Sequence, residues 1–183
     1  MYSVELLPDA ALSAEVRRLW QLLADAGLPS LARHAHPTNR PHVTVGLTDD
    51  LVPVRAAVAG VVLPALPVEA VLAGTAVFAG QQRNTLVLEL RSTPGLAALH
   101  ERVWSVLASG STAGASAQWP HLSPGAWRPH LSLALRLRPE QTDMALALLS
   151  SAQVGTAVTE LRGSLVTARC YDTVTRRADE LVL

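Results

Sequence analysis

One eight-residue segment occurs twice in this chain, once in each half. The first copy is Arg40–Leu47 (RPHVTVGL) and the second is Arg128–Leu135 (RPHLSLAL). Arg, Pro, His and the final Leu are identical, and the other four positions hold conservative replacements. Such a repeat indicates an internal duplication, and it therefore predicts a fold with two similar halves.

The alternation of residue types within each copy predicts a β-strand. Successive side chains of a strand point to opposite faces, so one face of each copy is apolar and is expected to pack on the core. The other face carries an imidazole, a hydroxyl and a very small residue. Small residues beside the polar pair are expected to leave room for a ligand. These faces consist of His42, Thr44 and Gly46 in the first copy and His130, Ser132 and Ala134 in the second.

Two histidines on equivalent strands can form an acid–base pair. Histidine titrates near neutral pH, so one neutral and one protonated imidazole can share proton transfer to and from a phosphate ester. The nearby hydroxyls can donate hydrogen bonds to phosphate oxygens. We therefore expect His42 and His130 to face a shared cleft and to act together on a phosphate ester. The alternative is two structural histidines in an accidental repeat.

The repeat resembles the two His-x-Thr/Ser motifs of the 2H phosphoesterase superfamily, and in particular the RNA 2′,3′-cyclic phosphodiesterase and 2′-5′ RNA ligase-like group. The resemblance implies that His42 and His130 are catalytic and that Thr44 and Ser132 bind phosphate. It also implies a 2′,3′-cyclic phosphate on an RNA end or nucleotide as substrate, or a related small cyclic phosphate, with no cofactor. RNA ligation is the reverse of the same reaction. The stretch from Gly163 to Tyr171 is loosely similar to the last strands of the family.

Several other residues are candidates for substrate binding. Arg40 and Arg128 precede the motifs and could clamp a phosphate, or could instead be solvated or pair with acids. Trp119 and Trp127 lie in a Ser-, Gly- and Pro-rich stretch at 111–128, predicted to be a long loop, where they could stack on a base. Trp127 could instead pack on the core. Tyr171 is a candidate for lining the cleft.

The remaining histidines suggest one alternative chemistry. His34 and His36, together with His42, could form a metal site, although no cysteine or nearby carboxylate joins them. We expect no metal. His100 falls on a predicted helix and is expected at the surface.

Periodicity predicts an α+β fold with helices packed on antiparallel sheet, forming two pseudo-symmetric lobes around a central cleft within a single domain, 1–183. Helices are expected over 12–23, between Pro53 and Pro64, from Pro94 to Gly110, and from Pro139 through Leu149. The expected strands are 3–7, 41–47, 68–79, 85–91, 129–135, 158–168 and 179–183.

Composition narrows the partners and mechanisms. The chain has 15 acidic and 15 basic residues, and every basic residue is arginine. The absence of lysine excludes Schiff-base and P-loop chemistry. A neutral chain is poorly suited to gripping long nucleic acid, whereas a nucleotide or an RNA end remains compatible. A non-catalytic module that binds such a ligand is a second hypothesis.

Compartment and assembly are less constrained. The single cysteine, Cys170, excludes an internal disulfide and a cysteine-based zinc site. No signal peptide or membrane-spanning segment is recognisable, so a cytoplasmic location is the default expectation. The oligomeric state stays open.

Overall fold

The computed structural model describes residues 1–110, 119–151 and 162–182. Its strands form one seven-stranded sheet in the order β2-β1-β6-β3-β4-β5, with β7 paired to β6. Every pairing is antiparallel. The strands are β1 (Tyr2–Pro8), β2 (Val43–Thr48), β3 (Val68–Phe78), β4 (Asn84–Leu90), β5 (His130–Leu137), β6 (Arg162–Asp172) and β7 (Ala178–Glu180).

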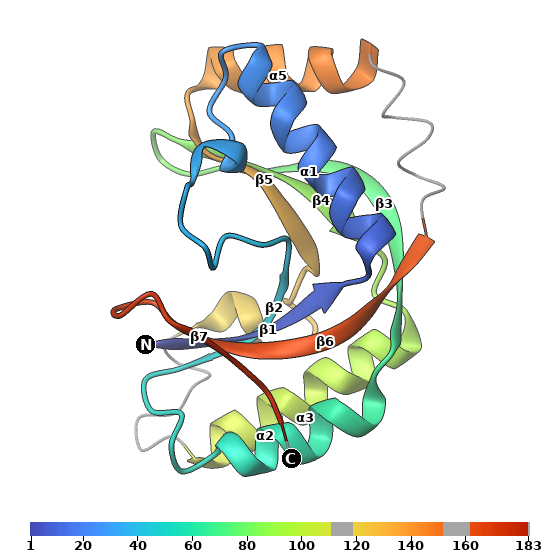
Figure 1. The fold of residues 1–183 in the computed structure, drawn as a ribbon, viewed down its shortest axis with the longest axis vertical. Helices are drawn as coiled ribbons and strands as arrows, with labels where there is room; N and C mark the ends of the chain where they lie inside the picture. Colours follow the sequence, from blue (N-terminus) through green and yellow to red (C-terminus); the bar gives the residue numbers. More distant parts are fainter. Residues whose placement is uncertain (111–118, 152–161, 183) are drawn as a thin grey trace.

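Helices cover the two ends of this sheet (Figure 1). The α-helices are α1 (Ala10–Asp25), α2 (Arg55–Val62), α3 (Pro94–Gly110) and α5 (Pro139–Ser151), and short 3₁₀ turns are η1 (Leu31–Arg33), η2 (Leu63–Ala65) and η3 (Pro120–Leu122). We call β2, β1 and β6 with α2 and α3 the first lobe, and β5, β4 and β3 with α1 and α5 the second lobe. Pairing of Val68–Val71 with Arg162–Leu165 joins the lobes. The predicted α+β class and its two lobes are confirmed.

Local sequence explains why α1 forms and where it packs. The Asp9 side chain accepts a hydrogen bond from the Leu12 amide at 2.8 Å, which caps the free N–H groups of the first turn. Gly27, with φ of 75°, follows the helix end. The helix starts from β1 of the first lobe but packs against β5 and α5 of the second. The buried side chains of its predicted apolar face are Leu12, Val16, Leu19 and Leu23.

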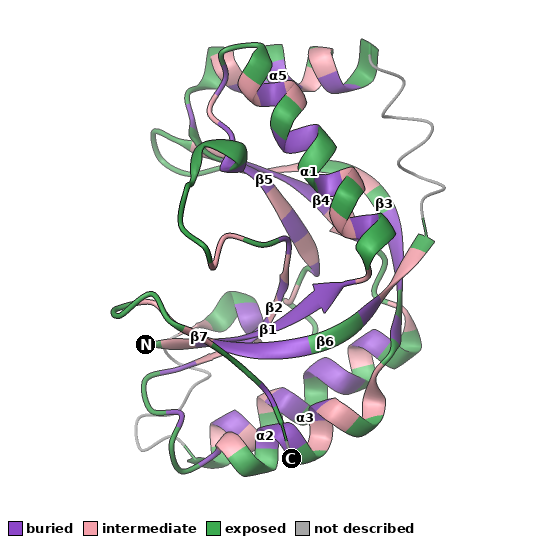
Figure 2. Ribbon diagram, in the orientation of Figure 1, coloured by how far each residue is buried: buried purple, intermediate pink, exposed green. Residues whose placement is uncertain are grey.

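Leu and Val side chains dominate the core, as the scarcity of aromatic residues predicts. Figure 2 shows that β1 is buried along almost its whole length. The predicted strands and helices are confirmed, with ends that differ by a few residues. Positions 111–118 of the predicted loop, 158–161 of one predicted strand and 183 of the last predicted strand lie outside the described residues.

Candidate active site

The two repeated histidines are held in the same way. His42 immediately precedes β2, and His130 is the first residue of β5. The Nδ1 atom of each lies 2.7 Å from the carbonyl oxygen two residues earlier, that of Arg40 or Arg128. A carbonyl oxygen only accepts, so Nδ1 is the donor in both rings. This bond leaves each Nε2 as the nitrogen that can exchange a proton with a ligand.

The backbone repeats as well. In the first lobe, Glu5 lies opposite Thr44 and Val4 opposite Gly46, so Val45 has no partner in the ladder. In the second lobe, Val87 lies opposite Ser132 and Leu86 opposite Ala134, so Leu133 has none. Each motif strand therefore gains one extra residue directly after its hydroxyl residue. An extra residue of this kind bends a strand and changes which side chains share a face.

This register shift overturns one sequence prediction. Gly46 faces the core and not the ligand, because a Cβ there would overlap Leu107 Cδ1 and lie 3.3 Å from Val103 Cγ1 on α3. Ala134 is likewise fully buried. Leu135, expected in the core, is 38% exposed and lines the pocket. Strict alternation was the wrong rule here, since the extra residue moves every following side chain to the opposite face.

A tryptophan fixes the backbone of each motif. The indole Nε1–H of Trp127 donates to the Thr44 carbonyl at 3.0 Å, and that of Trp20 donates to the Ser132 carbonyl at 2.8 Å. Trp127 thereby links the segment just before the second motif to the first motif. Trp20 belongs to α1, so a helix that starts in the first lobe braces the strand of the second.

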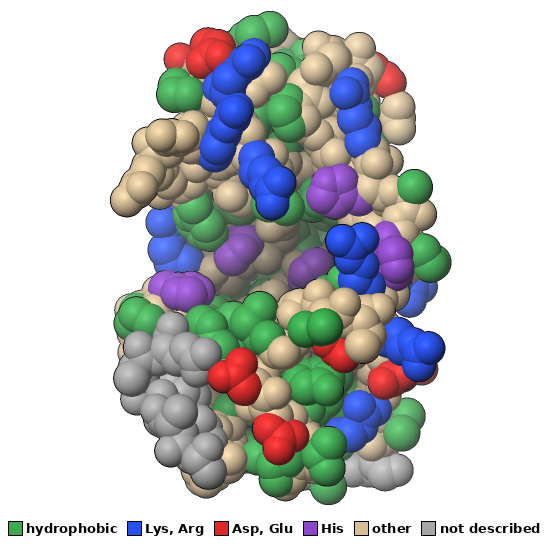
Figure 3. Space-filling view, turned by 90° about the vertical axis from the view of Figure 1, so that its left-hand side faces the viewer, with side chains coloured by type: hydrophobic (Ala, Val, Ile, Leu, Met, Phe, Trp, Pro, Cys, Tyr) green, Lys and Arg blue, Asp and Glu red, His purple; other side chains and the backbone are tan. Residues whose placement is uncertain are grey.

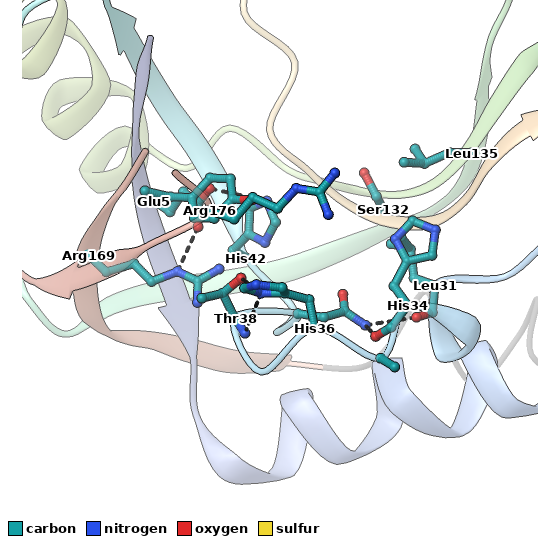
Figure 4. A pocket seen from close by; sticks show the side chains of 13 residues that line it. Glu5, Leu31, His34, His36, Thr38, His42, Ser132, Leu135, Arg169 and Arg176 are labelled. Atoms are coloured by element: carbon teal, nitrogen blue, oxygen red, sulfur yellow. Dashed lines mark hydrogen bonds and ion pairs between the residues drawn. The ribbon is translucent and has the colours of Figure 1, made fainter. Parts of the chain in front are cut away.

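A pocket of about 550 Å³ lies between the lobes. His42 enters it from the first lobe and Ser132 from the second, and Tyr171 lines it as expected. Figure 3 shows the hollow crossing this face, with histidine and arginine side chains around it. Figure 4 shows the pocket from close by. Its other polar lining residues are Glu5, His34, His36, Thr38, Asn39, Arg169 and Arg176.

His130 borders a second, largely apolar pocket of about 350 Å³. The Phe78 and His130 rings meet edge to face, with centroids 4.7 Å apart. The Arg128 guanidinium lies over the Phe78 ring, 4.7 Å from its centroid. Its Nε forms an ion pair with Glu89 Oε1 at 2.7 Å. Arg128 therefore pairs with an acidic residue, which was one of the alternatives that the sequence left open. It also lines the apolar pocket beside His130. The remaining lining residues are His121, Leu122, Ala126 and Trp127.

The two histidines have different electrostatic surroundings. Burial lowers the pKa of His130, and the nearby His42 lowers it further, while the bond to the Arg128 carbonyl opposes both effects. His130 is therefore favoured as the neutral imidazole. His42 Nε2 lies 3.6 Å from Glu5 Oε1, and that carboxylate is buried.

Two of the candidate substrate-binding residues line neither of these two pockets. Arg40 is exposed and lines neither pocket at the histidines, but a hollow with Arg17 and Trp20 that adjoins the larger pocket at His34 and His36. Trp119 is half-buried and lines neither of those two pockets. Its carbonyl accepts the Leu122 amide at 2.9 Å, which closes the short turn η3.

The prediction for His100 was wrong. Its ring is buried, 2% exposed, and stacks on Trp127 with centroids 4.0 Å apart and planes 3° from parallel. Among the described side chains, its Nε2 is the one buried polar atom without a hydrogen-bond partner. Burial lowers its pKa. Helical periodicity places His100 beside Leu96 and Val103, on the buried face, and that signal was available in the sequence.

Sequence reasoning also missed Glu5, Arg169 and Phe78. Glu5 interrupts the apolar run Val4–Leu7, and Arg169 stands between the small apolar residues Ala168 and Cys170. A charge in a strand that is otherwise buried signals a paired or functional group, because an unpaired charge there is strongly unfavourable. Nothing in the sequence alone brings Phe78 to His130.

Within the described ranges, no group of three His, Cys, Asp or Glu side chains is placed to hold a metal ion. His34, His36 and His42 all line the larger pocket but do not form such a group. No helix among the described residues is long and apolar enough to span a membrane.

Comparison with known proteins places these features in a family. The 2′-5′ RNA ligase superfamily profile matches residues 8–162. No curated protein matches the chain. Among solved structures, Usb1 of Kluyveromyces marxianus superposes with a TM-score of 0.53 at 14% identity, covering 100% of this chain and 97% of that one. Kluyveromyces marxianus Usb1 with uridine monophosphate gives 0.57 at 12% identity, with the same coverage. This chain therefore belongs to the 2′-5′ RNA ligase superfamily, the 2H phosphoesterases that its repeated motif resembles.

Proposed function

We propose that this protein is a phosphodiesterase that hydrolyses the 2′,3′-cyclic phosphate of an RNA end or a nucleotide, using His42 and His130 and no metal. The observation that carries the proposal is the equivalent mounting of the two rings. In each, Nδ1 donates to a backbone carbonyl at 2.7 Å and Nε2 stays available. A structural histidine pair has no reason to repeat this arrangement in both lobes.

The surroundings of the two rings suggest their roles. His130, with its lowered pKa, is the neutral base whose Nε2 takes a proton from the attacking water. The water oxygen bonds to phosphorus as the bond from phosphorus to one ribose oxygen breaks. His42 then donates its Nε2 proton to that leaving oxygen. The same pair would join RNA ends in a 2′-5′ linkage if the 5′-hydroxyl of a second strand, in place of water, bonded to phosphorus as the 3′ ribose oxygen left with the proton from His42.

The hydroxyl groups of Thr44 and Ser132 complete the proposed phosphate site. Each follows its histidine by two residues, and each backbone is braced by a tryptophan N–H. A hydroxyl held in place can donate to a phosphate oxygen as charge develops on it.

The apolar pocket beside His130 fits a planar base between Phe78, Leu122 and Trp127. Arg128 at its edge would lie near the attached phosphate. The polar pocket beside His42, with Tyr171, would hold the remainder of the nucleotide.

The test is hydrolysis of 2′,3′-cyclic AMP in EDTA across pH. The natural protein should give a bell-shaped profile, and His42→Ala and His130→Ala should each lose at least a hundredfold in kcat, roughly the share of one acid–base group. Glu140→Gln changes an exposed side chain that lines neither pocket and should retain turnover. Binding of the nucleotide should survive His42→Ala. Full turnover by either alanine variant of the pair would contradict the mechanism.

The natural protein itself decides between the enzyme and its alternatives. Binding of cyclic nucleotides without turnover would favour the binding module. Activity that appears only with added divalent metal would favour a metal hydrolase.

A further inference from the structure

One arginine in the pocket between the lobes has no acidic partner. Among the described residues, two arginines line that pocket, Arg169 and Arg176. Arg169 Nε donates to Glu5 Oε2 at 2.7 Å, and both side chains are buried, so the charge of Arg169 is already neutralised. Arg176, in the turn between β6 and β7, forms no ion pair within the described ranges. Its guanidinium group is therefore a permanent positive charge that an anion can bind.

The Arg176 side chain points into the pocket. In Figure 4 its guanidinium group extends toward Ser132, which belongs to β5 of the second lobe. The hydroxyl of Ser132 is the group that we propose donates to a phosphate oxygen. His42 lines the same pocket. An anion held between Arg176 and Ser132 would therefore contact both lobes and lie in the pocket that His42 enters.

The turn that carries Arg176 is held by several hydrogen bonds. The Asp172 carboxylate accepts bonds from the Thr175 amide and hydroxyl, at 3.3 and 2.8 Å. The Thr173 amide and hydroxyl both donate to the Met1 carbonyl, at 3.0 and 2.9 Å. The amide of Arg176 itself donates to the Asp172 carbonyl at 2.8 Å. These bonds fix the base of the side chain, so less conformational freedom is lost when it binds a ligand.

The backbone at Arg176 favours a different type of residue. Its φ is 58°, a left-handed conformation that glycine and asparagine adopt more readily than arginine does. A long side chain in this conformation costs free energy of folding, and residues of this kind are concentrated at functional sites. Arg176 is therefore better explained by what its side chain binds than by the turn that it occupies.

We propose that Arg176 is a catalytic residue that binds the non-bridging oxygens of the substrate phosphate together with the Ser132 hydroxyl. This inference rests on the proposed function and adds a charged group to its phosphate site. The cyclic diester carries one negative charge, and more charge gathers on those oxygens as the attacking water bonds to phosphorus. A guanidinium group can donate two parallel hydrogen bonds to them, and its attraction grows with that charge. The motif hydroxyls alone supply no positive charge.

The first test is kcat/KM for 2′,3′-cyclic AMP in Arg176→Asn. The expected loss is about ten- to hundredfold, which corresponds to one hydrogen bond to a charged group. Asparagine accepts the positive φ, so the urea midpoint of unfolding should not fall. A fall in activity that is accompanied by a lower midpoint would contradict a role in binding.

Two matched controls change comparable arginines outside the pocket. Arg177→Gln removes the same charge one residue further along, from a side chain that lines a different hollow. Arg136→Asn changes another arginine with positive φ, 59°, which lines neither pocket at the histidines. Both variants should retain turnover. A loss in either control equal to that in Arg176→Asn would overturn the specific role of Arg176.

Added guanidinium ion provides a readout that a structural role would not move. Arg176→Gly removes the side chain and leaves space for the ion, and glycine suits the positive φ. Guanidinium chloride, at concentrations far below those that unfold the protein, should restore part of kcat/KM in this variant. Sodium chloride at the same concentration should not. Equal effects of the two salts would overturn the proposal, because they would show that no guanidinium group is needed at this place.

Binding of inorganic phosphate separates this inference from the proposed function. Titration calorimetry measures it without turnover, and Arg176→Asn should bind phosphate about tenfold more weakly than the natural protein. An inactive natural protein whose phosphate binding still depends on Arg176 would overturn the proposed substrate and leave the anion site standing. An active natural protein whose kcat/KM and phosphate affinity are unchanged in Arg176→Asn would overturn the role of Arg176.

Discussion

Gly46→Ala tests how the motif strand is oriented. A methyl group at this position would overlap Leu107 Cδ1 and press on Val103 Cγ1 at 3.3 Å, and both side chains are buried. Overfilling a packed core costs about 1–3 kcal/mol. Alanine recovers about 0.5–1 kcal/mol, because it loses less backbone entropy on folding than glycine. The expected result is a net loss of about 0–2.5 kcal/mol in the free energy of unfolding, by the difference of these two effects.

Urea denaturation followed by tryptophan fluorescence measures this loss, and kcat and KM are measured on the folded variant. Leu107→Ala provides the matched background, because removing the overlapping atoms should make Gly46→Ala close to neutral. The reciprocal change, Ala134→Gly in the second motif, should also destabilise, by about 1–2 kcal/mol, through lost methyl burial and added chain entropy. Unchanged stability together with a raised KM would refute the reasoning, since it would place Gly46 against the substrate.

Two further predictions concern the braces of the motifs. Trp127→Phe keeps an aromatic ring against His100 but leaves the Thr44 carbonyl without its donor. The free energy of unfolding, measured by urea denaturation, should therefore fall by about 1–3 kcal/mol. Trp20→Phe leaves the Ser132 carbonyl without its donor and should lower the free energy of unfolding by a similar amount. If only one of the two variants were destabilised, the two tryptophans would not be equivalent. His100→Phe should make stability less sensitive to acid. Burial lowers the pKa of His100 below its usual 6.5, so the unfolded chain takes up a proton that the folded chain refuses. His100 therefore costs no stability above about pH 6.5 and progressively destabilises the fold as pH falls below it, by up to 1.36 kcal/mol per pH unit. The free energy of unfolding, measured by urea denaturation at several pH values between 7 and 5, should fall less with decreasing pH in His100→Phe than in the natural protein. The same pH dependence in both proteins would contradict the lowered pKa of His100.

The sequence predicted the elements well because their signals are local. Asp9 and Gly27 bound α1, and alternating residues mark both motif strands. The register shift that sends Gly46 into the core has no local signal, because both copies still alternate in sequence. It depends on pairing with β1, which only the folded sheet supplies.

Part of the proposed site can be recognised in the sequence. His42 and His130 are recognisable because they are repeated, and repetition is visible in the chain itself. Glu5 and Phe78 are not repeated, and they come close to the histidines only through strand order. The repeated histidines could therefore be predicted, whereas the unrepeated Glu5 and Phe78 could not.

The pairing of β1 with β6 has a consequence for biosynthesis. Glu5 and Arg169 are 164 residues apart in sequence, yet they are neighbours in one ladder. Contacts so distant in sequence form slowly, and an unpaired edge of β1 stays open until its partner strand arrives. A ribosome-bound chain halted before residue 162 would hold both histidines but lack β6 and the pocket wall that Arg169 and Tyr171 provide. The protein should thus gain its cleft only late in its own synthesis.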